Sequence, residues 1–222
     1  MRFRYLKGLL AGIIMFLFIN SGQTQTMEIG LFGGGSYYLG EMNPAFHFKK
    51  TQPAYGAMVR LNINPRWAVK LTYYRGGIKG VDSLTGRLVP NNYSFDAIVN
   101  DISAVAEFNF WEYFTGSKKS FFSPYIYGGV TYFFSDNASG VALPFGAGAK
   151  FSLSDRFALG AEWGMRKTFT DNLDGVNASE YQSGIDLGSD KTSTWDWYNF
   201  FGLSVTYKIN LRSKLKCNLE GW

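Results

Sequence analysis

The residues that could support catalysis are few in this chain and lie far apart. His47 is the only histidine, and Asp82 and Ser83 follow in a separate segment. A histidine that relays a proton between an aspartate and a serine would perform acyl transfer. Nothing in the spacing places His47 beside a nucleophile, and a lone histidine in a loop is usually solvated. We therefore expect no catalytic residues, and a rim acyltransferase that uses His47 is the alternative.

Two other patterns could bind ligands. Three glycines at 33–35 could cradle a phosphate, but such a loop needs a helix after it, and Ser36 continues an extended pattern. Four aspartates near the C-terminal end have a spacing that matches no calcium loop: Asp171, Asp174, Asp186 and Asp190. The sequence therefore predicts neither a metal nor a cofactor.

The first 25 residues predict a cleaved signal peptide. Three basic residues precede an apolar run at 9–19, and small and polar residues lead to Gln25. The run is too short for a membrane-spanning helix, which needs about 20 residues. We expect export by the general secretory route, a β domain over residues 27–210 and a periplasmic tail over 211–222.

The mature chain has the composition of one domain. It keeps 19 basic and 17 acidic residues, a net charge near +2, so the pI of about 9.2 for the whole sequence does not indicate nucleic-acid binding. Aromatic residues make up 18% of the chain and glycines number 26. Many large apolar side chains without a long apolar run favour a β protein in a membrane.

Eight segments of the mature chain alternate between apolar and polar residues, and turn-forming residues separate them. Each is long enough for a tilted membrane-spanning strand of about 9–11 residues. The apolar faces begin and end in aromatic side chains, such as Trp67 and Tyr73, as in the girdles at membrane interfaces. The segments cover 27–39, 54–64, 66–78, 95–111, 123–134, 141–153, 156–169 and 195–210.

This pattern predicts an all-β fold: an eight-stranded antiparallel transmembrane β-barrel of the OmpA or OmpX size in the outer membrane. A soluble β-sandwich is the alternative, since its strands alternate in the same way. Short turns at 64–65 and 154–155 indicate the periplasmic rim. The link 112–122 is long for that rim, and the link 135–140 is short for the external one. The other long connections are external: 40–53, 81–94 and 170–194.

The inward faces are expected to carry four acids and five bases. Buried charges persist when they are paired, so this near-balance predicts a paired interior network. A barrel of eight strands is just wide enough inside for side chains, so we expect no open diffusion pore. The lumen set comprises Glu28, Arg60, Lys70, Asp101, Glu107, Lys150, Glu162, Arg166 and Lys208.

The tail after the last strand is basic and holds Cys217, the only cysteine of the chain. An odd thiol in an exported protein indicates either an intermolecular disulfide or a free thiol. An incidental cysteine on a frayed tail is the alternative.

Several pieces of the mature chain resemble, in their order and spacing, the PorG family of Bacteroidetes outer-membrane proteins. The longest is 28–44, which reads EIGLFGGGSYYLGEMNP. The link 135–140 departs from the family, in which a longer insertion is expected. The other matching pieces are 53–56, 64–68, 107–110, 123–125 and 166–174.

The resemblance implies a non-enzymatic component of the type IX secretion system, which exports cargo with C-terminal sorting signals across the outer membrane. It also implies that the barrel docks or anchors a periplasmic ring of the lipoprotein PorK and its partner PorN, with a disulfide through Cys217 as one form of contact. A self-contained surface barrel that acts in binding or adhesion through the loop 170–194 is the alternative. The expected docking residues are Lys118, Lys119, Lys214, Lys216 and Cys217.

Overall fold

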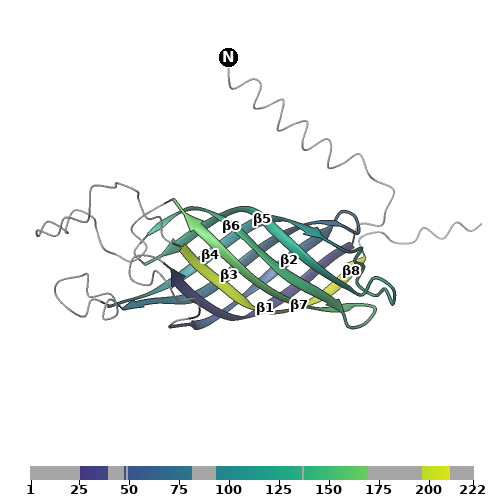
Figure 1. Cartoon of the computed structure of the whole chain (residues 1–222), viewed down its shortest axis with the longest axis horizontal. Helices are drawn as coiled ribbons and strands as arrows, with labels where there is room; N and C mark the ends of the chain where they lie inside the picture. The colour runs from purple at the N-terminus through teal and green to yellow at the C-terminus, as the bar shows by residue number, and fades with distance from the viewer. Residues whose placement is uncertain are drawn as a thin grey trace, which may run out of the picture.

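The strands of the chain close into a single barrel. The computed structural model describes residues 26–39, 48, 50–81, 94–136, 138–169 and 197–210. Each strand pairs antiparallel with its neighbour along the chain, and β1 pairs with β8 to complete the ring (Figure 1). The predicted eight-stranded antiparallel barrel is confirmed. Its strands are β1 (Thr26–Leu39), β2 (Gln52–Asn62), β3 (Trp67–Val81), β4 (Ser94–Asn109), β5 (Phe122–Ser135), β6 (Ser139–Ser152), β7 (Phe157–Thr168) and β8 (Trp197–Asn210).

The barrel wall carries apolar side chains on its outer face and charged side chains on its inner face, which is the reverse of a soluble protein. Leu31, Leu71 and Leu203 point outward and are 72%, 54% and 56% exposed, whereas the inward Glu107 and Lys70 are 0% and 1% exposed. An apolar outside and a charged inside lower the free energy only where hydrocarbon surrounds the wall. The alternative of a soluble sandwich is therefore wrong, and the chain is a transmembrane barrel of the outer-membrane type.

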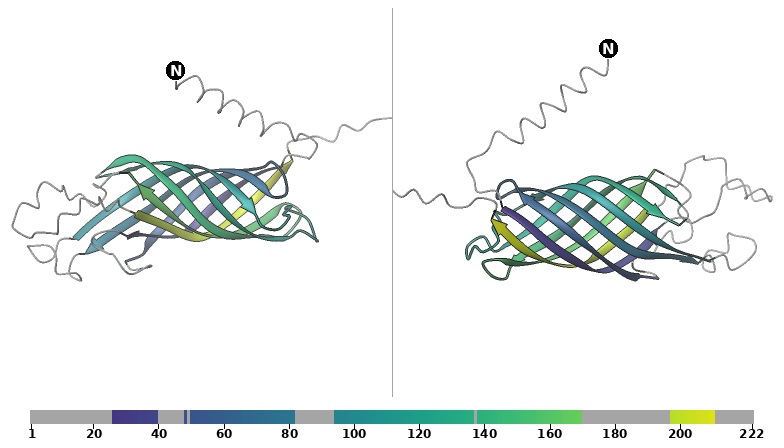
Figure 2. Two further views of the ribbon diagram at one scale, coloured as in Figure 1. Left: turned by 45° about the horizontal axis from the view of Figure 1, so that its top comes forward. Right: turned by 180° about the vertical axis from the view of Figure 1, so that it is seen from behind.

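Among the residues that the structure describes, no helix is long and apolar enough to span a membrane. The strands tilt around one long axis, as the views from two further sides show (Figure 2).

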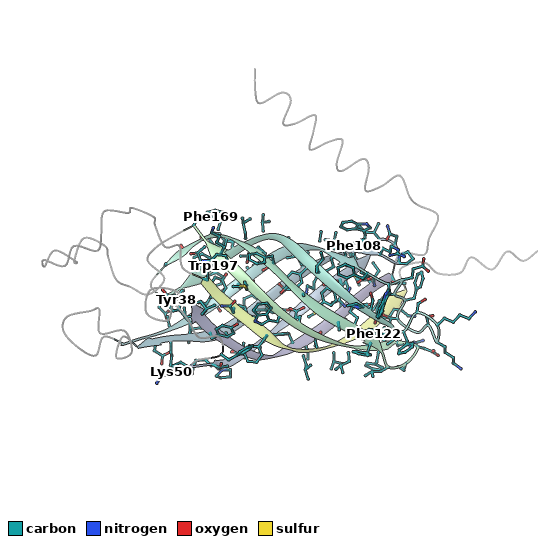
Figure 3. The ribbon with its side chains drawn as sticks, in the orientation of Figure 1. Tyr38, Lys50, Phe108, Phe122, Phe169 and Trp197 are labelled. Atoms are coloured by element: carbon teal, nitrogen blue, oxygen red, sulfur yellow. The ribbon has the colours of Figure 1, made fainter. Side chains whose placement is uncertain are left out.

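Aromatic side chains gather toward both ends of the outer face. The rings of Trp67 and Phe108 lie 5.0 Å apart near the short turns. Figure 3 shows Phe108 and Phe122 toward this end of the barrel, and Phe169 and Trp197 toward the other. Amphipathic rings favour the boundary between hydrocarbon and headgroups, so these two groups indicate the membrane interfaces.

The short turns at the periplasmic end take four residues each, which is more than predicted. The Asn64 side chain explains the first turn, because its Oδ1 accepts hydrogen bonds from the backbone N–H groups of Arg66 and Trp67, at 2.9 and 2.8 Å. Ser154 acts similarly in the second turn, where its Oγ accepts from the backbone N–H of Phe157 at 3.2 Å. Such side-chain bonds compete with the strand ladder and end it early.

The seam between β1 and β8 depends on a close approach of two glycines. Gly34 and Gly202 are partners in the β1–β8 register. A Cβ on Gly34 would lie 2.5 Å from the Cα of Gly202 and would also clash with the Phe201 carbonyl oxygen. Gly33, the preceding residue, faces outward, and a Cβ there would meet nothing within 4 Å.

Replacing Gly34 with valine is expected to open the seam, because the added carbons would clash with the backbone of Phe201 and Gly202 on β8. Overpacking of this kind costs roughly 1–3 kcal/mol or more. We expect G34V to lower the urea midpoint of unfolding in lipid vesicles and to reduce the fast-migrating folded band on unheated gels. The matched variant G33V should keep both; equal losses in the two variants would contradict the assigned packing.

Candidate functional site

Eight of the nine charged residues predicted to face the lumen are buried inside the barrel, with exposed fractions of 0–6%. The ninth, Lys208, is half-buried at the periplasmic end, where its Nζ donates to the carbonyl oxygen of Thr115. The buried eight are Glu28, Arg60, Lys70, Asp101, Glu107, Lys150, Glu162 and Arg166.

Glu107 on β4 is the centre of the lumen network. Its Oε2 accepts from Nε of Arg60 at 2.9 Å and from Nζ of Lys150 at 2.5 Å. Its Oε1 lies 3.0 Å from Nζ of Lys70. Arg60 also donates from Nη1 to Glu28 at 2.8 Å. One carboxylate therefore holds cations from three other strands in the narrow interior.

Lys70 extends this network across the barrel to β7. Its Nζ lies 2.7 Å from Oε2 of Glu162. The hydroxyls of Tyr74 and Tyr125 also donate to Glu162, at 2.7 and 3.0 Å. Every oxygen of this carboxylate is thus occupied, and the two tyrosine rings fill the space beside it.

A separate ion pair lies nearer the external end. Arg166 donates from Nε to Asp101 at 3.4 Å, and the Tyr198 hydroxyl donates to the same carboxylate at 2.8 Å. Ser103 donates to its other oxygen at 2.5 Å. This pair lies among aromatic side chains of one buried cluster, since Phe133 is the register partner of Asp101 and the Arg166 guanidinium lies 4.7 Å from the centre of the Phe200 ring.

The eight buried charges form four negative and four positive groups, and each carboxylate contacts at least one cation. Such pairs offset much of the cost of removing charges from water. The paired side chains join opposite strands across the lumen. Over the described ranges, no three His, Cys, Asp or Glu side chains are grouped so that they could hold a metal ion.

The long link between β4 and β5 folds into the periplasmic mouth. Thr115 is 6% exposed and donates from Oγ1 to Glu28 at 2.6 Å, which ties the link directly to the lumen charges. The backbone N–H of Gly116 donates to Oγ of Ser152 at 2.7 Å. Gly116 has φ of +92°, a conformation that favours glycine. Tyr113 is 3% exposed, and burial together with the nearby Glu28 charge raises its pKa to about 12.

Sequence reasoning recorded the excess length of this link but missed Tyr113 and Thr115 as parts of the interior. The available signal was a 12-residue connection at a rim whose other described turns have four residues. Length alone does not reveal that the extra residues turn inward, because the partner Glu28 is 87 positions away in the sequence.

The predicted docking residues fall into two groups. Lys118 and Lys119 follow the buried part of the link and are exposed. The tail residues Lys214, Lys216 and Cys217 lie outside the described residues. His47 and the residues weighed with it, and the four aspartates of 170–194, also lie outside them.

The central position of Glu107 predicts a large effect on stability. E107Q would leave three cations facing a neutral amide in a dry interior, which is expected to cost about 3–5 kcal/mol of unfolding free energy. The loss is measured by urea unfolding in lipid vesicles, with tryptophan fluorescence as the signal. The control is D96N, because Asp96 forms a 2.8 Å pair with Lys79 on the outer rim and is 63% exposed. Its loss should be about 0–1 kcal/mol. Similar small losses in both variants would show that the lumen network is not what stabilises the barrel.

Solved structures that resemble the chain are small outer-membrane barrels. The N-terminal β-barrel domain of Pseudomonas aeruginosa OprF has 15% identity and a TM-score of 0.46, covering 85% of this chain and 100% of that one. Yersinia pestis Ail, solved with the heparin analogue sucrose octasulfate, has 13% identity and a TM-score of 0.49, covering 84% and 100%. Neisserial surface protein A has 12% identity and a TM-score of 0.48, and the match covers 84% of this chain and 98% of that one.

Comparison with curated proteins finds no match. A family model described as a domain of unknown function, DUF6089, matches residues 7–215, and the chain therefore belongs to that family.

Proposed function

We propose that this barrel is a non-enzymatic outer-membrane component of a type IX secretion system, and that it docks or anchors a periplasmic ring of the PorK and PorN type. The observation that carries the proposal is the β4–β5 link, which Thr115 fixes inside the mouth and on which Lys118 and Lys119 are exposed. The PorG resemblance supplies the identity of the partner. The family description names no function.

The filled lumen supports a role at the rim. Large side chains from opposite strands meet across the interior, as in the contact of Lys70 with Glu162. A folded or unfolded polypeptide has no path between such side chains. Cargo would therefore pass elsewhere in the machine, and this barrel would contribute a fixed point in the membrane.

The shape of the link supports docking. Hydrogen bonds from Thr115 and Gly116 attach it to β1 and β6. Its apolar residues Phe114 and Phe121 are 42% and 50% exposed. A platform that is held rigidly loses little conformational entropy when it binds, and two adjacent lysines favour an acidic partner surface.

The tail is the second part of the proposed docking surface. Its residues 211–222 lie outside the described residues, so contacts through Lys214, Lys216 and a disulfide through Cys217 stay predictions. Export by the general secretory route and the absence of catalysis stay predictions as well.

Charge reversal on the link tests the proposal. In cells that carry tagged barrel, K118E/K119E is expected to reduce the PorK and PorN recovered with the barrel by at least about fivefold, since two like charges would replace two attractions. Export of cargo should fall with it. The charge-retaining variant K118R/K119R is the matched control and should keep both near the unaltered level.

Both variants must show the folded band on unheated gels, so that loss of the barrel is distinguished from loss of docking. Docking through the link is wrong if folded K118E/K119E barrels recover the ring proteins and export cargo as the unaltered barrel does.

A further inference from the structure

Arg75 differs from the arginines of the lumen in its surroundings. Arg60 and Arg166 point inward and contact carboxylates. Arg75 lies on the outward face of β3, because its two neighbours in the sequence, Tyr74 and Gly76, are buried on the inward face. Among the described residues its hydrogen-bond partner is a neutral amide, since Nη1 donates to Oδ1 of Asn100 at 3.1 Å. The barrel thus presents a guanidinium group to the membrane.

The depth of Arg75 places its backbone within about 5 Å of the outer boundary of the hydrocarbon. It lies eight residues beyond Trp67, which belongs to the periplasmic aromatic group. At about 3.4 Å per residue and a tilt of about 40°, this corresponds to roughly 20 Å along the membrane normal. The apolar band of such barrels is about 25 Å tall. The guanidinium can therefore reach the level of the headgroups in the outer leaflet.

Asn100 on β4 holds this arginine in a defined orientation. Its Oδ1 accepts from the Tyr73 hydroxyl at 3.0 Å as well as from Arg75, and its Nδ2 donates to the Phe134 carbonyl at 3.4 Å. Asn100 itself is only 9% exposed, although it points outward. Tyr55 on β2 is the register partner of Arg75 on the other side. Arg75 therefore has Asn100 on one neighbouring strand and Tyr55 on the other.

The surface around Arg75 changes along the strands from apolar on the side of the membrane centre to charged on the side of the external end. Toward the membrane centre lie Leu71 and Ile102, which are 54% and 52% exposed. Toward the external end lies Asp96, but this carboxylate pairs with Lys79 at 2.8 Å. The charge of Arg75 is thus left without a carboxylate partner on these two strands, directly above a surface that suits acyl chains.

We propose that Arg75, oriented by Asn100, binds the phosphate of a phosphorylated glycolipid in the outer leaflet, whose acyl chains lie along Leu71 and Ile102. One N–H of the guanidinium goes to Asn100, and the remaining donors can form two parallel bonds to a phosphate. The Tyr55 position lies level with Arg75, and Tyr73 lies two residues nearer the membrane centre. This site goes beyond docking at the opposite rim and does not depend on it.

Native mass spectrometry of the purified barrel in detergent micelles tests the proposal with two probes, diphosphorylated lipid A and the same lipid A after dephosphorylation. The unaltered barrel is expected to bind the phosphorylated probe at least about tenfold more tightly. R75Q should abolish this preference. R75K should keep part of it, because an ammonium retains the charge without the planar pair of donors.

Two further variants separate binding from general damage. N100A should lower the phosphate preference while the folded band on unheated gels persists, since Asn100 is a positioning residue. R156Q is the matched control, because Arg156 donates to the neutral Tyr207 hydroxyl at 3.0 Å near the periplasmic rim. It should keep the full preference.

Four results would overturn the proposal. R75Q could retain the preference, or R156Q could lose it equally. Inorganic phosphate at the probe's concentration could displace the lipid, which would make the site one for a free anion. Phosphatidylglycerol could bind as tightly as lipid A in an Arg75-dependent way, which would assign the site to phospholipid rather than glycolipid.

Discussion

The contact of Glu107 with three cations is the interaction on which the interior of this barrel depends. Eight tilted strands leave a space that side chains must fill, and the charged ones must pair there because water is excluded. Arg60, Lys70 and Lys150 reach Glu107 from three different strands. Through Arg60 the network continues to Glu28, and through Lys70 to Glu162. Each of these charged side chains would be costly to bury alone. As pairs, they hold opposite strands of the barrel in a fixed arrangement.

The two ends of the barrel use this interior differently. At the periplasmic end the β4–β5 link joins the network through Thr115, so a surface segment is anchored to buried charges. Toward the external end the ion pair of Asp101 and Arg166 lies among aromatic side chains that include Phe133 and Phe200. On the outside, Asn100 and Arg75 form a hydrogen bond toward the external boundary of the apolar band. The proposed docking role rests on the periplasmic end, and the proposed glycolipid site rests on the external boundary.

The sequence predicted the features that follow from the position of each strand in the barrel wall. Lipid lies on one side of every strand and a narrow interior on the other, so a period of two revealed both the strands and the inward charges. The number of opposite charges indicated that they pair, but the partners could not be predicted, since Lys70 and Glu162 are 92 positions apart. The inward turn of Tyr113 and Thr115 was missed for the same reason. Turn lengths were underestimated because the side chain of Asn64 takes over backbone bonds.

The ionic conductance of the purified barrel in a planar lipid bilayer tests the central claim most directly. An interior filled by paired side chains should leave the current at the level of the bare membrane under an applied voltage. Stable, stepwise currents through the unaltered protein, with an ion selectivity that changes when Glu107 is replaced, would show that the lumen is an open charged channel and would contradict the account.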